Sequence, residues 1–435
     1  MPAHPEPALL LHSLVPLIVE NARLERPTRE AVRRHAPPRP VIVAFGKGAC
    51  SMARGALEAI GEPDGGVIVT PRDSPCRLPG LESLESTHPL PSDASIRAAE
   101  AVLEWARSAG RSGGLLALVS GGGSALVEKP LPGLTLEDIV ETSRLLLESG
   151  LSILEINTVR KHLSQVKGGR LAEAASPALV TGVYASDVPG DRLDLIASGP
   201  TVPDPTTYED AARILRLSGL WSRVPSRVRS LIEAGLQGRI PETPKPGSPV
   251  FERVENTLAA SNLALLRETA RALEERGYRT LILTSRLEGE SREAAKTLAS
   301  IALEAHERGI PLQPPAAILV GGETSVTVRN PAGRGGRNTE LALALALRVD
   351  YWRPDLPPGT ITVLSMDTDG IDGNTPSAGA IAYNGLTRVA RAHGLDPYRA
   401  LQENNTHPLL EALGLTVDTG PTGSNLNSIT IILVH

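Results

Sequence analysis

The sequence predicts an α/β protein with two domains. The chain has 435 residues, which is more than one hydrophobic core usually serves. Short apolar runs rich in β-branched residues are repeatedly followed by a loop of small residues and then by a helical stretch. Strands that alternate with helices in this way form a parallel sheet with helices on both faces. A proline-rich segment at residues 236–250 divides the pattern into two series.

The first series contains four predicted strands. Three of them lead into loops of glycine, serine or charged residues. Such loops lie at the carboxyl ends of the strands, where parallel sheets bind their ligands. The strands and their loops are Val41–Phe45 with Gly46–Ala49 and a helix to Ile60, Gly66–Thr70, Leu115–Val119 with Ser120–Ser124, and Ala178–Ala185 with Ser186–Asp191.

The proline-rich segment sets the predicted boundary, because its prolines exclude a helix and make a poor strand. We expect one domain over residues 1–240, a second over 250–435, and an active site in the cleft between them. Beyond the boundary the alternation restarts, with strands at Thr280–Thr284, Ala316–Val320, Ser325–Val328 and Ile429–Val434, helices at Ser291–Arg308 and Leu341–Leu347, and Leu258–Ser261 ahead of a helix.

The composition excludes several classes of protein. A formal net charge of -5 provides no basic field for nucleic acid or for an anionic membrane. Cys50 and Cys76 are too few for a disulfide framework or a cysteine-based zinc site, and they favour a reducing, cytoplasmic location. The apolar residues between Leu9 and Val19 predict a packed helix rather than a signal peptide, because no Lys or Arg precedes them.

Two glycine loops of the first series suit anionic ligands. Gly46–Gly48 places backbone N–H groups and the Lys47 ammonium where a helix begins. It matches neither a Walker A loop nor a complete dinucleotide fingerprint. The residues Ser120, Gly121, Gly122, Gly123 and Ser124 allow close approach of the backbone to a ligand. The alternatives are a tight turn with a surface lysine and a flexible connection.

Charged residues follow these loops. Arg160, Lys161, Lys167 and Arg170 concentrate positive charge, although a solvated helix face is the better interpretation for any one of them. Asp187 and Asp191 come directly after a strand and would suit Mg²⁺; for Asp187, capping of the turn is an equal alternative. For Asp204, capping is favoured.

The second series has three further loops with chemical groups. Gly333–Glu340 carries Arg337 and Asn338 between glycines and a helix, where an arginine could stabilise a transferring phosphoryl group. Glu323 follows a strand and two glycines, and Asp369 lies among the three acids of Ser365–Asn374, whose spacing fails the EF-hand pattern. Thr419–Asn427 supplies small hydrogen-bonding residues before the last strand.

Together these loops resemble the glycerate 2-kinases whose C-terminal half is named after the MOFRL motif. The resemblance covers essentially the whole chain and rests on Ser120–Leu126, Asn157–Ala172, Ser186–Thr206, Gly321–Leu347, Asp369–Ala380 and Thr419–Asn427. It implies a larger Rossmann-like N-terminal domain, a smaller α/β C-terminal domain, ATP, Mg²⁺ or another divalent cation, and D-glycerate phosphorylated at its 2-hydroxyl. It also implies that Lys47 and Arg337 are the catalytic pair. Arg192, Leu193, Met366, Asp367 and Ser428 depart from the family pattern, and the departure at Ser428 argues against a metal role for the last loop.

The predicted mechanism is in-line phosphoryl transfer by positioning and charge neutralisation. Lys47 and Arg337 would bracket the γ-phosphoryl group, and Asp187 or Asp191 would hold Mg²⁺ or accept the hydroxyl proton. The predicted substrate and nucleotide contacts are Gly46, Ser120, Gly121, Gly122, Gly123, Ser124, Arg160, Asp191, Glu323, Asn338 and Asp369. The alternatives are an NAD(P)H-dependent hydroxypyruvate reductase, which the incomplete glycine fingerprint disfavours, and a metabolite sensor without catalysis. We expect no nucleic-acid or membrane partner, and a homodimer is left open.

Overall fold

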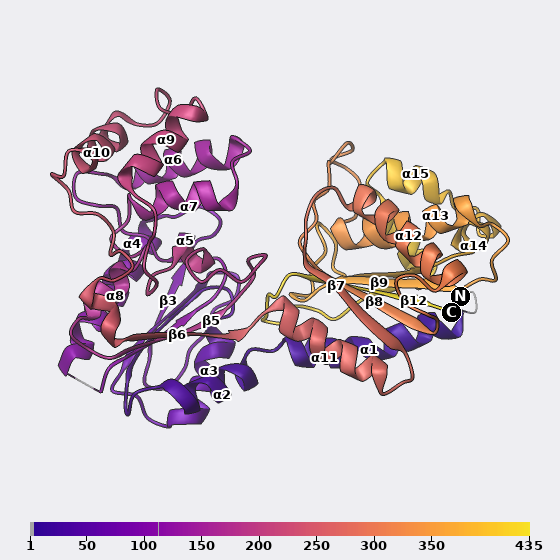
Figure 1. Ribbon diagram of the computed structural model, residues 1–435, viewed down its shortest axis with the longest axis horizontal. Helices are drawn as coiled ribbons and strands as arrows, with labels where there is room; N and C mark the ends of the chain where they lie inside the picture. The colour runs from indigo at the N-terminus through magenta and orange to yellow at the C-terminus, as the bar shows by residue number, and fades with distance from the viewer. Residues whose placement is uncertain (1–3, 112) are drawn as a thin grey trace. The chain divides into compact units, whose positions relative to one another are not determined.

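The computed structural model describes residues 4–111 and 113–435, which form two compact units (Figure 1). One unit is Leu24–Ala260, and the other joins Ser261–His435 to the chain before Leu24. The observed division therefore falls at Ala260, not at residues 240–250, and the N-terminal helix belongs with the C-terminal half. Each unit contains one β-sheet with helices on both faces, so the predicted α/β class is confirmed.

The sheet of the Leu24–Ala260 unit has six strands in the order β3-β2-β1-β4-β5-β6, and every pair of neighbours is parallel. The order reverses between β1 and β4, which run side by side with Val41 opposite Leu115. Open parallel sheets bind ligands at this kind of switch point. The strands are β1 (Val41–Phe45), β2 (Gly66–Pro71), β3 (Glu82–Ser86), β4 (Leu115–Val119), β5 (Val180–Ala185) and β6 (Val254–Ala260).

Helices cover both faces of this sheet. On one face, α2 (Glu25–His35) packs on α3 (Ala49–Ile60), and α3 contacts β1 and β2. On the other face, α4 (Asp93–Ser108) contacts β1, β2 and β3 and packs on α8 (Arg170–Ala175). Because they are covered on both sides, β1 and β4 are fully buried and read as continuous apolar runs.

A separate helical layer in this unit has its own apolar core (Figure 1). It contains α6 (Leu136–Glu148), α7 (Ile153–Lys161), α9 (Tyr208–Leu217) and α10 (Ser226–Leu236). The first three helices begin with capping boxes, at Thr135, Ser152 and Thr207.

The proline-rich segment after α10 is not a linker. Glu242 accepts hydrogen bonds from the backbone N–H of Tyr208, at 2.9 Å, and lies 3.1 Å from His162 Nε2. Thr243 Oγ1 donates to Asp204 at 2.9 Å. The predicted boundary there is wrong, because the residues between the prolines bind back to the helical layer and the chain then forms β6 of the first sheet.

The second sheet has the order β11-β10-β9-β12-β8-β7 and is mixed. Only β7 and β8 pair in parallel among the described strands of this sheet. The predicted strand Ser325–Val328 is wrong, since Ser325 forms only an isolated bridge with Glu290. The strands are β7 (Arg279–Leu287), β8 (Ala316–Gly322), β9 (Ile361–Asp367), β10 (Gly379–Tyr383), β11 (Thr416–Val417) and β12 (Ser428–Val434).

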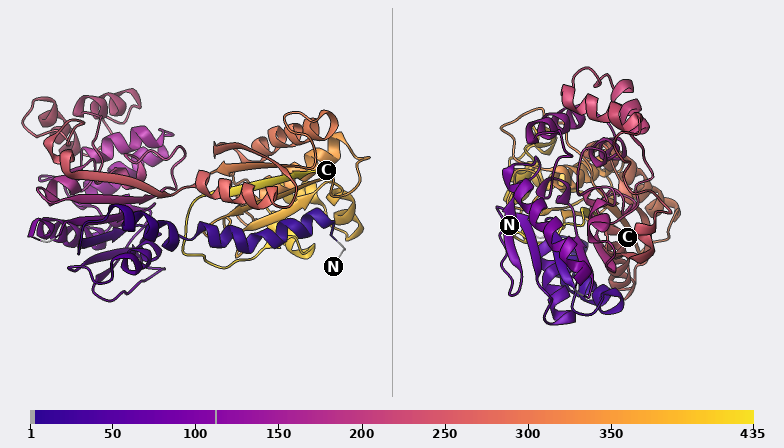
Figure 2. Two further views of the ribbon diagram at one scale, coloured as in Figure 1. Left: turned by 60° about the horizontal axis from the view of Figure 1, so that its bottom comes forward. Right: turned by 90° about the vertical axis from the view of Figure 1, so that its left-hand side faces the viewer.

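Helix α1 (Glu6–Ala22) packs along α11 (Asn262–Glu274) and contacts β9 and β10 (Figure 2). The predicted packed helix at the N-terminus is therefore confirmed. Helices α12 (Ser291–Arg308) and α13 (Arg337–Trp352) pack on each other at the other face. The shorter helices are α14 (Leu386–Ala392), α15 (Pro397–Gln402) and α16 (Thr406–Ala412). Among the described residues, no helix is both long and apolar enough to span a bilayer.

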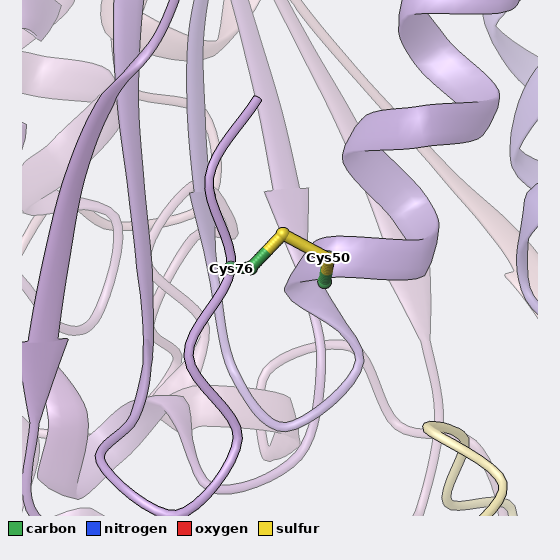
Figure 3. The surroundings of a disulfide bond; sticks show 2 residues. All are labelled: Cys50 and Cys76. Atoms are coloured by element: carbon green, nitrogen blue, oxygen red, sulfur yellow. A yellow bond between two sulfur atoms is a disulfide. The ribbon is translucent and has the colours of Figure 1, made fainter. Parts of the chain in front are cut away.

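Cys50 and Cys76 form a disulfide (Figure 3). Cys50 lies in the first turn of α3, and Cys76 lies in the loop between β2 and β3. The low cysteine count does not provide a disulfide framework, as expected, but the two residues are not free thiols. The count therefore no longer argues for a reducing compartment.

Candidate active site

The loops after β1 and β4 are joined at the switch point of the first sheet. The N–H of Gly48 donates to Ser120 Oγ at 3.0 Å, and the N–H of Lys47 donates to the carbonyl of Gly121 at 2.8 Å. Gly46 has a φ of +123°, and a Cβ atom there would lie 2.2 Å from Ser120 Oγ. Glycine is therefore required at position 46 for both its backbone conformation and its contact with Ser120.

We refer to Ser120–Ser124 as the glycine turn. The Lys47 side chain is exposed and passes beside it, since a Cβ on Gly122 would lie 3.2 Å from Lys47 Cγ. The Asp187 carboxylate, which follows β5, lies against the turn on its Gly121 side, where a Cβ would be 1.7 Å from Oδ2. The structure thus brings together three of the predicted elements, one cation, one anion and a stretch of bare backbone.

The two serines of the glycine turn have structural partners. Ser120 Oγ accepts the hydrogen bond from Gly48 described above. Ser124 Oγ lies 2.7 Å from Ser198 Oγ, and Ser198 donates to Asn157 Oδ1 at 2.8 Å. These bonds tie the turn to α7 and to the segment after β5. These bonds fix the position of the turn. The two serine hydroxyls therefore hold the site in shape, whereas the sequence predicted that they contact the ligand.

The cations of α7 and the following turn are mostly internal. Lys161 is 1% exposed and lies between Asp194, at 3.3 Å, and Asp204, at 3.4 Å. Lys167 is also 1% exposed and pairs with the buried Glu128. Their interpretation as a solvated helix face is wrong, because a buried ammonium is stable only beside a carboxylate.

Arg160 is half-buried near the same carboxylate. Burial lowers the pKa of the Arg160 guanidinium, and the negative charge of Glu128 raises it. The Nε atom of Arg160 is buried and has no hydrogen-bond partner among the described residues. Arg160 therefore keeps hydrogen-bonding capacity for a ligand, as does Arg170, whose Nε and one terminal nitrogen are also buried without a partner among the described residues.

The aspartates after β5 differ in their surroundings. Asp191 is half-buried with a φ of +56°, in a tight turn where its N–H donates to the Val188 carbonyl at 3.0 Å. Asp204 accepts from the N–H and hydroxyl of Thr206 at 3.0 and 2.7 Å, so its predicted capping role is confirmed.

The donor set fits a metal ion that arrives with phosphate. Mg²⁺ is usually held by one or two carboxylates together with phosphate oxygens and water. Asp187 beside the glycine turn offers one such carboxylate. Within the described ranges, no group of three or more His, Cys, Asp or Glu side chains could hold a metal by itself.

The second unit gathers charged groups around Arg337, the first residue of α13. Its Nε donates to Asp367 Oδ2 at 2.9 Å, a second nitrogen also binds Asp367, and a third binds Glu323. Glu323 is half exposed, whereas Asp367 at the end of β9 is 2% exposed. The guanidinium is thus held in one orientation by two carboxylates.

Burial dominates the electrostatics of Asp367. It raises the pKa of this carboxyl to about 7, even though the positive charge of Arg337 opposes the shift, and Asp369 and Asp372 add to it. The Oδ1 atom of Asp367 is buried without a hydrogen-bond partner in the described chain. The pKa of Arg337 is raised, because Asp367 and Glu323 outweigh the burial that would lower it.

Asn338 and Asp372 fix the start of α13. Asp372 accepts from the N–H groups of Asn338 and Thr339, each at 2.9 Å, and from Asn338 Nδ2 at 3.1 Å. Asn338 Oδ1 accepts from Ser365 at 2.8 Å. The Asn338 side chain is fully engaged by the protein, so its predicted contact with a ligand has no support in this geometry. Asp369 is half-buried and accepts from the N–H of Ile371 at 2.9 Å.

Sequence reasoning missed two residues at these sites. Asp367 lies in the acidic loop Ser365–Asn374, but its contact with Arg337 spans 30 positions and leaves no local signal. No sequence motif marks His88, whose ring lies beside Gly122 of the glycine turn. A histidine directly after a predicted strand could have drawn attention to it, had β3 been recognised.

Comparison with known proteins places the chain in a family. The domain of unknown function DUF4147 matches residues 8–233, and the MOFRL family matches residues 316–428. A glycerate 2-kinase from Pyrococcus horikoshii is 43% identical over 393 residues, which are 90% of this chain and 87% of the relative. A relative from Agrobacterium vitis with the provisional name of a hydroxypyruvate reductase is 41% identical and covers 93% of this chain and 90% of its own.

A solved structure agrees with the sequence relatives. The crystal structure of a glycerate kinase from Thermotoga maritima matches with a TM-score of 0.88 and 39% identity, over 98% of this chain and 99% of that one. The chain therefore belongs to the glycerate kinase family that combines a DUF4147 domain with a MOFRL domain.

Proposed function

We propose that the protein transfers the γ-phosphoryl group of ATP to the 2-hydroxyl of D-glycerate, giving 2-phosphoglycerate and ADP. The observation that carries the chemistry is the convergence of Lys47, Asp187 and bare glycine backbone at the switch point of a parallel sheet. The identity of the substrate is supported by the relative from Pyrococcus horikoshii, which is named a glycerate 2-kinase.

The first site suits binding and neutralisation of phosphate. Phosphoryl transfer needs little covalent help from a protein, so positioning and charge stabilisation are the main contributions. The exposed Lys47 ammonium would contact a non-bridging phosphoryl oxygen, while Gly121–Gly123 let the nucleotide approach the backbone. Mg²⁺, when bound with the nucleotide, would reduce the negative charge on its phosphates, and Asp187 is the residue best placed to hold it.

The acceptor hydroxyl must lose a proton during the transfer. Asp187 and Asp191 are the candidate acceptors, because both carboxylates follow β5 in this unit. A carboxylate that holds the metal is a poor proton acceptor, because a metal lowers the basicity of its ligand, so the two roles fall to different residues. We assign the metal to Asp187 and the proton to Asp191.

Arg337 is proposed to stabilise the charge that spreads over the transferring phosphoryl group. A guanidinium presents several donors in a plane and remains charged, which suits this task. Asp367 would act as a positioning residue, since it binds two nitrogens of Arg337. Whether residues of both units serve one phosphoryl transfer stays a prediction. A cytoplasmic location is inferred only from the use of ATP.

The test is the direct reaction. Purified protein is incubated with D-glycerate, ATP and Mg²⁺, and the products are identified by ³¹P NMR. A 2-phosphoglycerate signal with loss of ATP is the expected result. A 3-phosphoglycerate signal would contradict the position of transfer. Intact ATP, combined with NAD(P)H oxidation in a parallel assay with hydroxypyruvate, would replace the kinase by a reductase.

A further inference from the structure

The His88 ring lies at the glycine turn although it comes from the outermost strand of the sheet. His88 follows β3, and β2 and β1 separate β3 from β4 in the strand order. A Cβ placed on Gly122 would lie 3.2 Å from His88 Cδ2 and 3.5 Å from Nε2. The same Cβ would lie 3.2 Å from Lys47 Cγ, so His88 and Lys47 flank one backbone position.

The surroundings of His88 are predominantly positive. Burial lowers the pKa of the His88 imidazole, the charges of Lys47 and Arg160 lower it further, and Asp73 partly opposes them. These groups come from the loop after β1, from α7 and from the loop after β2. A ligand bound beside this ring therefore gains most if it carries negative charge.

His88 is not needed for the hydrogen bonding of its own loop. Thr87 Oγ1 donates to the carbonyl of Leu90 at 3.0 Å and lies within hydrogen-bond distance of Ser92 Oγ, at 2.8 Å, and these contacts shape the segment. Neither ring nitrogen of His88 forms a hydrogen bond with another described residue. Neighbouring residues shield part of the ring from water, but the residue as a whole is exposed, so a ligand can reach it. By contrast, the buried His162 lies 2.7 Å from the Thr158 carbonyl and 3.1 Å from Glu242.

We propose that His88 is a ligand-binding residue of this site and donates a hydrogen bond to an anionic oxygen held beside Gly122, together with Lys47. This inference rests on the proposed function and adds a specific contact to it. Two sources supply the required chemistry, the carboxylate of D-glycerate and a phosphate of ATP. A neutral imidazole carries one N–H, so the ring can act as a donor without being charged.

The kinetic test compares His88→Leu with wild type, because leucine has no hydrogen-bond donor. His393→Leu is the matched control, because His393 is exposed in the other unit and its ring bonds, among the described residues, only to the Val389 carbonyl at 2.9 Å. Loss of a hydrogen bond to a charged group should raise one KM about 10- to 100-fold, with a smaller change in kcat. A rise for D-glycerate identifies its carboxylate, and a rise for ATP identifies a phosphate. Two unchanged KM values in a folded, active variant would overturn the proposal.

A binding measurement separates this inference from the proposed function. The chain has nine histidines, so the imidazole signal of His88 must first be assigned in the ¹H–¹⁵N spectrum. It is the signal that disappears in His88→Gln, or in His88→Asn if the first variant fails to fold. That signal should shift in wild type when D-glycerate or metal-free ATP is added. If neither ligand moves it, the proposal is overturned, whether or not the protein phosphorylates glycerate. Wild type that binds but does not phosphorylate overturns the proposed function alone.

Discussion

Asp367 binds two nitrogen atoms of the Arg337 guanidinium, from a position at the end of β9 where its carboxylate is almost completely buried. The second oxygen of Asp367 has no partner among the described residues. The buried negative charge of ionised Asp367 is therefore only partly stabilised by hydrogen bonds. This unfavourable burial occurs at a residue that orients a candidate catalytic arginine. Strain or incomplete pairing of this kind is typical of functional sites.

Asp367→Asn should change how stability depends on pH. The folded-state pKa of Asp367 is about 7, above the value of about 3.9 for an unfolded aspartate. The folded protein therefore holds the proton more tightly, and the stability due to this group is complete below pH ~4 and is lost as pH rises through ~7. Relative to Asp367→Asn, wild type should lose at least about 1 kcal/mol of unfolding free energy between pH 5 and pH 8.

Denaturant unfolding of both proteins at the two pH values measures this difference. A gap between wild type and variant that does not change with pH would contradict the raised pKa. The same variant should lower kcat, because an asparagine cannot hold two guanidinium nitrogens as strongly as a carboxylate.

Lys47→Ala should lower kcat/KM by about a hundredfold or more without destabilising the protein. The ammonium is exposed, so its removal leaves no buried group unpaired, whereas one charged donor typically contributes about 2 to 4 kcal/mol to a transition state. Lys296→Ala is the control, since its half-exposed side chain on α12 pairs with Glu293, at 2.7 Å, and with no other carboxylate of the described chain. Activity is measured with D-glycerate and ATP, and thermal unfolding by calorimetry. Near-normal activity of Lys47→Ala would remove Lys47 from the mechanism.

The sequence predicts best those elements that are buried on both faces. The bounds of β1, β4 and α12 agree with the expected ranges, because continuous apolar runs and a long helical stretch carry their own signal. β3 was missed, since it is Glu-Ser-Leu-Glu-Ser at a sheet edge and mostly exposed. The expected domain boundary places β6 in the wrong domain, because the sequence of a strand does not show which other strand it pairs with.

The site was predictable as a set of loops but not as a set of contacts. Lys47, Gly121–Gly123 and Asp187 could be found because glycines and charges follow recognisable strands. The burial of Lys161 and Lys167 could not, because their partners Asp204 and Glu128 lie 43 and 39 positions away. A buried ion pair depends on tertiary structure, so local charge patterns suggest solvent exposure by default.

Gly46→Ala should abolish activity and destabilise the protein more than an ordinary glycine substitution. Its φ of +123° is unfavourable for alanine, and the new methyl group would lie 2.6 Å from the Ser120 carbonyl oxygen. Gly133→Ala is the matched control, with a φ of +95° and nothing within 4 Å of its Cβ position. The control should lose about 1 kcal/mol, from the backbone conformation alone. Equal losses in both variants, measured by denaturant unfolding, would show that contact with Ser120 is unimportant.

Replacing both cysteines should make stability independent of reductant. The Cys50–Cys76 bond joins the start of α3, three residues beyond Lys47, to the loop after β2 and closes a sequence separation of 26. A bridge across a loop of this size usually contributes about 2 to 4 kcal/mol, largely by restricting the unfolded chain. Wild type should therefore melt at a lower temperature in dithiothreitol, whereas Cys50→Ser/Cys76→Ser should melt at that lower temperature with or without it.

The contradicting outcome is a wild-type melting temperature that dithiothreitol leaves unchanged although alkylation shows both thiols to be reduced. The bridge would then not stabilise the native fold. Loss of activity on reduction, without unfolding, would instead indicate that the bridge holds the Lys47 loop in its active position.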